Sequence, residues 1–285
     1  MQVLMRLLIT LALVCPPLYA SAAVGVLDRI KATKTLSIAY APNAYPVSFK
    51  NEEGKPSGYS VALCERVVGA IKRDLGLDKL DIKWMEGNTP RRLAAVANGE
   101  VDMECGITTI NLQRQSKVDF SNIVFVESGG VLVFAESGIE NLSGLAGKRL
   151  AAIPDTTTEK RLRAVLQERA IDAELVPVKD SKDGREQMVA GKVDALAGDR
   201  LVLIGQVAAA GGAERFSILE EEFSIDPYAF ALKRNDADFR LAVNRGLAQL
   251  YRTGEIDTIF TRWFGEDASP TELLDSLYFI FGFSD

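Results

Sequence analysis

The chain has 285 residues, of which 47% are apolar and 25% charged, a composition ordinary for a soluble globular protein with room for two modest lobes. The formal net charge of −6 is spread along the sequence without a basic patch, which disfavours nucleic acid as a partner. There is no histidine and no cysteine cluster, so a typical zinc site, a Ser-His-Asp triad and a Cys-His nucleophile are excluded. We predict no metal and no cofactor.

The first 23 residues have the pattern of an export signal. Arg6 supplies a positive charge, residues 7–14 form a short apolar core, and residues 20–22 (Ala-Ser-Ala) give a small-residue cleavage pattern. The apolar run is too short to span a bilayer. We predict cleavage after Ala22 or Ala23.

Two cysteines, Cys64 and Cys105, remain after such cleavage. Export to an oxidising compartment allows a disulfide between them. Two buried free thiols are the favoured alternative, because the sequence gives no distance between the two positions.

The first predicted strand covers residues 35–41, where apolar and polar side chains alternate, and it leads into a loop over residues 42–46. In sheets with helices on both faces, a loop at a strand end commonly faces the ligand. Tyr45, with Tyr40 and Phe49, is therefore a candidate for packing over a bound side chain. Filling the core is the alternative.

A helix is predicted from Tyr59, and residues 80–85 alternate as a second strand. The helix is indicated by apolar residues at helical spacing: Val61, Cys64, Val68 and Ile71. Strands and helices in succession predict an α/β lobe with a largely parallel sheet.

The next helix begins near Thr89 and Pro90, a good helix entry. Arg91 and Arg92 lie in its first turn, where the positive end of the helix dipole repels their charges. An unfavourable arrangement of charges that nothing nearby compensates suggests a functional role. Arg92 lies one turn before Val96, on the buried side, so it is a candidate anion ligand. The alternative is a solvated surface arginine.

Small and polar residues follow a predicted strand over residues 101–103. Gly106 permits close backbone approach, and residues 107–109 (Ile-Thr-Thr) then offer amide and hydroxyl donors. Arg114 follows within five residues of Thr109. A planar guanidinium beside such donors suits a carboxylate, which it can hold through two parallel charge-assisted bonds.

Residues 123–135 form a long apolar strand with Gly129 and Gly130 in its middle. We predict that it crosses to a second lobe and that the glycines act as a hinge. A bulge in a buried strand is the alternative. The predicted return crossing covers residues 228–233.

The second lobe begins near Glu136, with a short helix over residues 141–146 and a strand over residues 148–153. Residues 155–159 (Asp-Thr-Thr-Thr-Glu) form the next strand-to-helix junction. Asp155 is a candidate helix cap, which leaves amides and threonine hydroxyls of the first turn available to an anion.

Two more strands are predicted over residues 173–178 and 193–197, and Asp199 stands just after the second. At that end of the sheet its carboxylate can pair with an ammonium group. Capping a helix over residues 201–209 is the alternative.

After the return crossing, two amphipathic helices are predicted to pack back onto the first lobe. Their apolar positions are Phe239, Val243, Leu247 and Leu250, then Ile256, Ile259, Phe260 and Trp263. The tail, residues 270–285, ends in an apolar run too short to span a membrane. It either covers a groove of the lobe or contacts a partner.

Together these motifs resemble the periplasmic solute-binding proteins for polar amino acids, and most of all their glutamate- and aspartate-binding branch. The resemblance covers nearly all of the mature chain and rests on RR at 91–92, ECGITT at 104–109, QRQ at 113–115, VDFS at 118–121 and DTTTE at 155–159. It implies the α/β, two-lobed type II periplasmic-binding-protein fold. Each lobe then has a mostly parallel sheet flanked by helices, and two crossing strands form the hinge.

The resemblance divides the chain into a signal peptide and two lobes. The implied ranges are 1–23 for the signal peptide, 24–131 and 230–285 for lobe 1, and 132–229 for lobe 2, with the hinge near 129–135 and 226–233.

Carried over residue by residue, the resemblance assigns the ligand contacts. Arg114 and Thr109 hold the α-carboxylate, Thr156 adds donors from the other lobe, Asp199 holds the α-ammonium, and Arg92 binds an acidic side chain. The remaining candidate ligand-binding residues are Ile107, Thr108, Thr157 and Tyr45.

Three positions depart from the acidic-ligand branch. Ala41 stands where that branch has a second arginine, Ser181 replaces a histidine, and Ile107 replaces a serine. Arg91 is a candidate substitute for the missing cation. The prediction is therefore a polar or acidic amino acid, without a single substrate.

The implied protein is a periplasmic monomer that is not an enzyme. It captures a free amino acid and delivers it to the transmembrane subunits of an ABC permease. One alternative is an exported dehydratase-like enzyme on the same scaffold, with Glu104 or Asp155 as general acid. Another is a ligand-sensing subunit of a membrane receptor.

Overall fold

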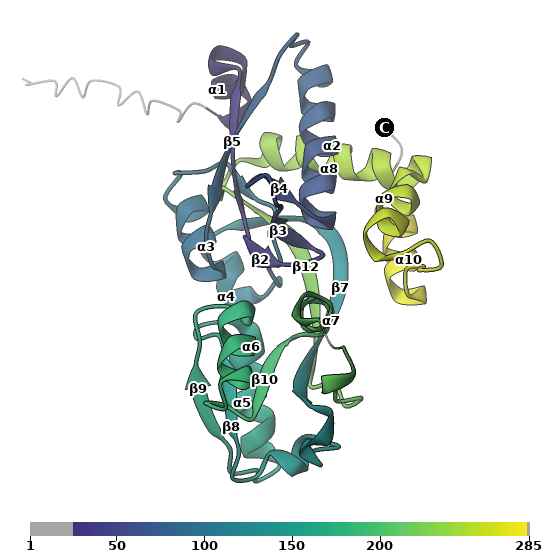
Figure 1. Ribbon diagram of the computed structural model, residues 1–285. Coiled ribbons are helices and arrows are strands. Elements are labelled where there is room, and N and C mark those ends of the chain that lie inside the picture. The colour runs from purple at the N-terminus through teal and green to yellow at the C-terminus, as the bar shows by residue number, and fades with distance from the viewer. Residues whose placement is uncertain (1–24, 212, 284–285) are drawn as a thin grey trace, which may run out of the picture.

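The computed structural model describes residues 25–211 and 213–283 as two lobes joined by two long strands (Figure 1). Lobe 1, the upper lobe in the figure, contains both ends of the described chain, and the middle of the sequence forms lobe 2. The predicted signal peptide lies outside the described residues. Among the helices of the described ranges, none is long and apolar enough to cross a membrane.

One mixed sheet runs through both lobes. Its strands lie in the order β5 (Asp81–Glu86), β1 (Thr35–Tyr40), β6 (Met103–Glu104), β12 (Ser224–Leu232), β7 (Asp119–Phe134), β10 (Ala195–Asp199), β8 (Arg149–Ala152) and β9 (Glu174–Pro177), and β11 (Phe216–Ile218) also pairs with β7.

The strand directions confirm the predicted two-lobed α/β fold. In lobe 1, β1 runs parallel to β5 and β6, and in lobe 2, β8 runs parallel to β9 and β10. The crossing strands β7 and β12 run antiparallel to each other and to their outer neighbours, so they join the two parallel sets into one sheet. The predicted lobe boundaries fall inside these two strands and stay a prediction.

The helices flank this sheet. In lobe 1 they are α1 (Val26–Thr33), α2 (Tyr59–Asp74), α3 (Thr89–Ala97), α4 (Leu112–Gln115), α8 (Ala237–Thr253), α9 (Glu255–Phe264) and α10 (Glu272–Phe281). In lobe 2 they are α5 (Thr157–Glu168), α6 (Ser181–Val189) and α7 (Arg200–Ala210), with 3₁₀ turns η1 (Ala135–Ser137), η2 (Leu142–Leu145) and η3 (Ala213–Arg215). A small sheet of β2 (Asn43–Ala44), β3 (Ser48–Lys50) and β4 (Pro56–Ser57) lies on lobe 1.

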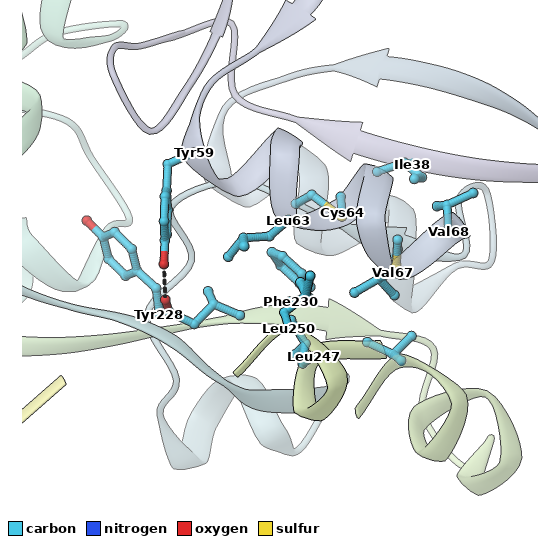
Figure 2. Packing of buried hydrophobic residues seen from close by; sticks show 14 of the residues in the cluster. Ile38, Tyr59, Leu63, Cys64, Val67, Val68, Tyr228, Phe230, Leu247 and Leu250 are labelled. Carbon is cyan, nitrogen blue, oxygen red and sulfur yellow. Dashed lines mark hydrogen bonds between the residues drawn. A yellow bond between two sulfur atoms is a disulfide. The ribbon is translucent and has the colours of Figure 1, made fainter. Parts of the chain in front are cut away.

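The core of lobe 1 lies between the sheet and helices α2 and α8. Figure 2 shows Leu63, Cys64 and Val67 of α2 near Phe230 of β12 and Leu247 of α8, all of them buried. Val67 follows Cys64 by three residues and Leu63 by four, which puts the three side chains on one face of α2, and Cys64 is among the apolar positions that predict this helix. Lobe 2 has separate apolar clusters built from β8, β10, α5 and α7.

The double glycine lies in β7 where pairing with lobe 2 begins, with Gly129 opposite Asp199 of β10. A Cβ atom at Gly129 would come within 2.5 Å of the Phe223 ring, so close packing requires glycine there. The register of the β7–β12 ladder shifts elsewhere, between Tyr228 and Ala231. The alternative of a bulge at the glycines is therefore wrong, while their role as a hinge stays a prediction.

Cys64 of α2 and Cys105, just after β6, are joined by a disulfide with a Cα–Cα distance of 6.3 Å. Both residues are fully buried in lobe 1. The favoured expectation of two free thiols is wrong, because the fold brings α2 directly over the end of β6.

The C-terminal tail folds back onto lobe 1 as α10, next to α8 and β7. Leu274 and Tyr278 are buried, and the Tyr278 hydroxyl lies 2.6 Å from the Tyr59 hydroxyl. The prediction that the tail covers a groove of lobe 1 is therefore confirmed for the buried face of α10. Its outer face exposes Phe279 and Ile280.

Candidate ligand-binding site

A cavity of about 410 Å³ lies between the two lobes. Lobe 1 lines it with Arg92, Thr109 and Arg114, and lobe 2 with Thr156 and Asp199. A volume of this size is in the range of small-molecule sites. Most of the predicted site residues therefore meet at one place.

Direct contacts between the lobes enclose this cavity. Asn43 Nδ2 donates to Asp180 Oδ2 at 2.8 Å, and Thr157 Oγ1 donates to Thr109 Oγ1 at 3.1 Å. Each of these bonds joins lobe 1 to lobe 2. The structure is thus a closed arrangement of the two lobes around a cavity.

Arg114 lies on α4, which is capped by the Asn111 side chain accepting from the Arg114 backbone N–H at 2.8 Å. Its guanidinium donates to the Thr109 carbonyl oxygen at 2.6 Å and, within the described part of the chain, forms no ion pair. Burial lowers the pKa of Arg114 and the nearby Glu104 carboxylate opposes this, but an arginine stays cationic at any physiological pH. Its unused N–H donors suit a carboxylate.

The N-terminus of α5 forms the opposite wall. Thr156 is the cap, with its Oγ1 accepting from the Glu159 backbone N–H at 3.1 Å and donating to the Ile153 carbonyl at 2.8 Å. The cap predicted at Asp155 is wrong, since Asp155 is an exposed residue with φ of 62°. Thr157 begins the first turn and lines the cavity, where free backbone amides favour an anion.

Asp199 lies at the carboxyl end of β10. Its Oδ1 accepts from Thr158 Oγ1 at 2.9 Å and its Oδ2 accepts from the Tyr228 hydroxyl. Asp199 holds the N-cap position of α7, but its side chain makes no capping hydrogen bond to that helix. Burial raises the pKa of Asp199 to about 6, against the lowering effect of the Tyr228 hydrogen bond. Near pH 7 the carboxylate is ionised and can pair with an ammonium group.

A guanidinium from lobe 1 and a carboxylate from lobe 2 thus line one cavity, with helix-end amides beside them. The family model of bacterial extracellular solute-binding proteins, family 3, matches residues 36–266. The chain belongs to this family.

Individual relatives agree with the family assignment. The L-glutamate/L-aspartate-binding protein of Pseudomonas aeruginosa is 30% identical over 266 residues, which are 93% of this chain and 88% of that protein. The glutamate/aspartate import solute-binding protein of Salmonella typhimurium is 28% identical over 254 residues, or 89% and 84% of the two chains. A solved ancestral arginine-binding protein bound to arginine has a TM-score of 0.73 at 23% identity, covering 81% of this chain and 99% of that one, which shows the shared fold.

In this family 3 protein, Arg92 is held by its own lobe. Arg92 Nε donates to Glu104 Oε1 at 2.7 Å, and both side chains are buried. The helix α3 begins at Thr89 as predicted, and its side-chain cap is Asn88, which accepts from the Arg91 backbone N–H. Arg91, the candidate substitute cation, is exposed, pairs with Glu100 and does not line the cavity.

The other candidate residues of lobe 1 divide between the cavity and the interior. Ile107 lines the cavity, whereas Thr108 is buried behind it, with Oγ1 3.4 Å from Arg92 Nη2. The prediction that Tyr45 packs over the ligand is wrong, because Tyr45 does not line the cavity. Its ring packs edge-on against Phe49, with 5.0 Å between ring centroids.

Sequence reasoning missed the partners of Asp199. Tyr228 belongs to a crossing strand, and nothing in its local pattern distinguishes it from a core aromatic residue. Thr158 belongs to the recognised threonine run, but its contact depends on α5 facing the end of β10. Four charged residues of the wall were also missed: Lys50, Glu86, Lys179 and Asp180.

Behind Asp199 the crossing strands bury two further carboxyl groups, Glu127 of β7 and Asp226 of β12, which lie opposite each other in the ladder. Burial raises the pKa of Glu127 to about 8, and Asp199 contributes to the rise. Glu127 therefore keeps its proton at neutral pH and adds little negative charge beneath the cavity. Across the described ranges, no three acidic or cysteine side chains are grouped as a metal site.

Proposed function

We propose that the protein is an extracytoplasmic solute-binding protein that captures a polar amino acid between its lobes and delivers it to an ABC importer. One observation carries the proposal: Arg114 and Asp199, from different lobes, line the same cavity. Their opposite charges match the two ends of a zwitterion. The glutamate- and aspartate-binding relatives support these two amino acids as candidate ligands.

The geometry supports a simple mechanism of capture. The ligand carboxylate accepts two parallel bonds from Arg114 and further bonds from Thr109 and from the α5 amides near Thr157. The ligand ammonium pairs with Asp199. Because each lobe supplies a different part of the site, full binding requires closure, and the ligand favours the closed state by its differential affinity.

The closed form is the signal that the transmembrane subunits of the permease would recognise. The export pattern of the first 23 residues and the family of the chain support a location in the periplasm. All residues assigned to the ligand belong to one chain, so we propose that the protein binds its amino acid as a monomer.

Binding without chemistry is the better interpretation of this cavity. An enzyme on the same scaffold needs a carboxyl group of suitable pKa in reach of the substrate. The two predicted general acids do not meet this need, because Glu104 pairs with Arg92 and Asp155 lies outside the lining. Asp199 lines the cavity with a pKa raised to about 6, and the proposed mechanism engages it with the ligand ammonium.

Ligand binding is expected to raise the melting temperature of the purified protein. At a hundredfold excess over Kd, one bound amino acid stabilises the folded state by about 2.7 kcal/mol, or roughly 5–10 °C for a chain of this size. Differential scanning fluorimetry with each standard amino acid checks this. N-acetyl and methyl-ester derivatives, which lack one charge each, are the controls. If no standard amino acid shifts the transition, the proposal is wrong.

Affinity is also expected to depend on pH through Asp199. Its pKa of about 6 means that below this pH the ligand ammonium must displace a proton, so affinity falls by up to tenfold per pH unit as the pH drops from 6. Calorimetric titration from pH 4.5 to 8 measures the profile. Asp155→Asn, a change outside the cavity, should keep it, and Asp199→Asn should remove it. If the affinity of the Asp199→Asn variant depended on pH as in the wild-type protein, a group other than Asp199 would be responsible for the pH dependence.

A further inference from the structure

We infer that the bound amino acid has an uncharged side chain, and that Glu104 sets this preference by neutralising Arg92 inside lobe 1. This inference rests on the proposed function and narrows its ligand. It follows from the charges around the cavity once Arg114 and Asp199 are assigned to the ligand's carboxylate and ammonium.

Arg92 is the cation assigned to an acidic ligand side chain, but its hydrogen-bonding capacity is largely used within the protein. Nε donates to Glu104 Oε1 at 2.7 Å, Nη1 to the Gly87 carbonyl at 2.7 Å, and Nη2 to Thr89 Oγ1 at 3.1 Å and, at 3.4 Å, to Thr108 Oγ1. Arg92 is 1% exposed and Glu104 is fully buried, so water screens their mutual attraction little. The pair therefore presents almost no net charge to the cavity.

Three other charged residues of the wall form ion pairs. Lys50 pairs with Glu86, and Glu159 pairs with Arg163 at 2.6 Å. Lys179 is exposed to water, which screens its charge. Its neighbour in the sequence, Asp180, also lines the cavity and carries the opposite charge.

A part of the wall is apolar. Ala41 and Ala44 of lobe 1 and Val202 of α7 form a buried cluster, with Ile107 packed against it, and all four line the cavity. A charged group placed against such a surface loses hydration without gaining a partner. This wall favours the apolar part of a ligand side chain.

A side-chain carboxylate in this cavity would lose its water, and among the described lining residues the one cation besides Arg114 without an ion pair is Lys179, whose charge water screens. An amide of the same shape carries no charge and still donates and accepts hydrogen bonds. Glutamine and glutamate, and asparagine and aspartate, therefore form matched pairs that differ mainly in charge.

The first test compares these pairs by calorimetry with the wild-type chain at pH 7.5. Glutamine or asparagine is expected to bind at least tenfold more tightly than the corresponding acid. Tighter binding of glutamate or aspartate than of the amides would overturn the inference and leave the proposed function standing. Binding of no amino acid would overturn the proposed function, and the inference with it.

The second test assigns the preference to Glu104. Glu104→Gln frees the charge of Arg92, so the ratio of acid affinity to amide affinity is expected to rise by about tenfold to a hundredfold. Glu100→Gln, which breaks the exposed ion pair between Arg91 of α3 and Glu100 after that helix, is the matched control and should leave the ratio unchanged. An unchanged ratio in a folded Glu104→Gln protein would overturn the role of Glu104. The wild-type comparison decides the ligand class even if this variant does not fold.

Discussion

Replacing Arg114 with alanine is expected to remove measurable affinity for every amino acid. The change deletes two charge-assisted hydrogen bonds to the ligand carboxylate, each worth about 1.5–3 kcal/mol, so Kd rises by roughly two to four orders of magnitude. The α-carboxylate is common to all amino acids. The loss should therefore not depend on the ligand side chain.

Folding of the Arg114→Ala variant should change little, because the guanidinium makes one hydrogen bond to the Thr109 carbonyl and no ion pair within the described chain. Thermal melting without ligand checks this, and calorimetric titration measures the affinity. Arg91→Ala is the matched control, since Arg91 is an exposed arginine that does not line the cavity. Arg114→Lys keeps the charge but loses the two-bond geometry, so an intermediate loss is expected. Wild-type affinity in Arg114→Ala would contradict the assigned role.

Breaking the Cys64–Cys105 disulfide is expected to have the largest effect on stability. The two residues are 41 positions apart, and the chain-entropy model gives about 4 kcal/mol for closing a loop of that length in the unfolded state. The expected result is a fall of that size in the free energy of unfolding, measured in denaturant with and without a reductant.

The double variant Cys64→Ser, Cys105→Ser separates loss of the bond from other effects of the reductant. It should melt at the lower temperature of the reduced wild-type protein and show no further response to reductant. Both cysteines lie in the core of lobe 1 and outside the cavity, so the affinity of the folded variant should change little. Two titratable thiols in the native, unreduced protein would contradict the bond.

The spacing of apolar residues along the sequence determined the positions of several strands and helices of this protein. The alternation over residues 35–41 and 80–85 predicts β1 and β5, which the structure has at Thr35–Tyr40 and Asp81–Glu86. Helical spacing predicts α2, α8 and α9, because one face of each must be buried. The order of strands and helices then fixes the fold class, since parallel strands need crossover connections.

Local chemistry also identified much of the cavity wall. Arg114 and Thr109 are indicated by a cation and donors that follow a strand, whereas the family resemblance assigns Thr156 and Asp199 to the ligand, and all four line the cavity. Unpaired backbone N–H and C=O groups occur at the ends of helices and strands. A short motif at such an end can therefore predict a binding function with little information about the rest of the chain.

Only the tertiary structure decided which charges remain available to a ligand. Arg92 and Arg114 are alike in the sequence, but Glu104 meets Arg92 at 2.7 Å and leaves Arg114 without an ion pair in the described residues. Tyr228 reaches Asp199 across 29 positions, and Cys64 reaches Cys105 across 41. Residue type determines what a side chain can do. Its partner depends on which distant segments the fold brings within about 3 Å, a distance that no local pattern contains.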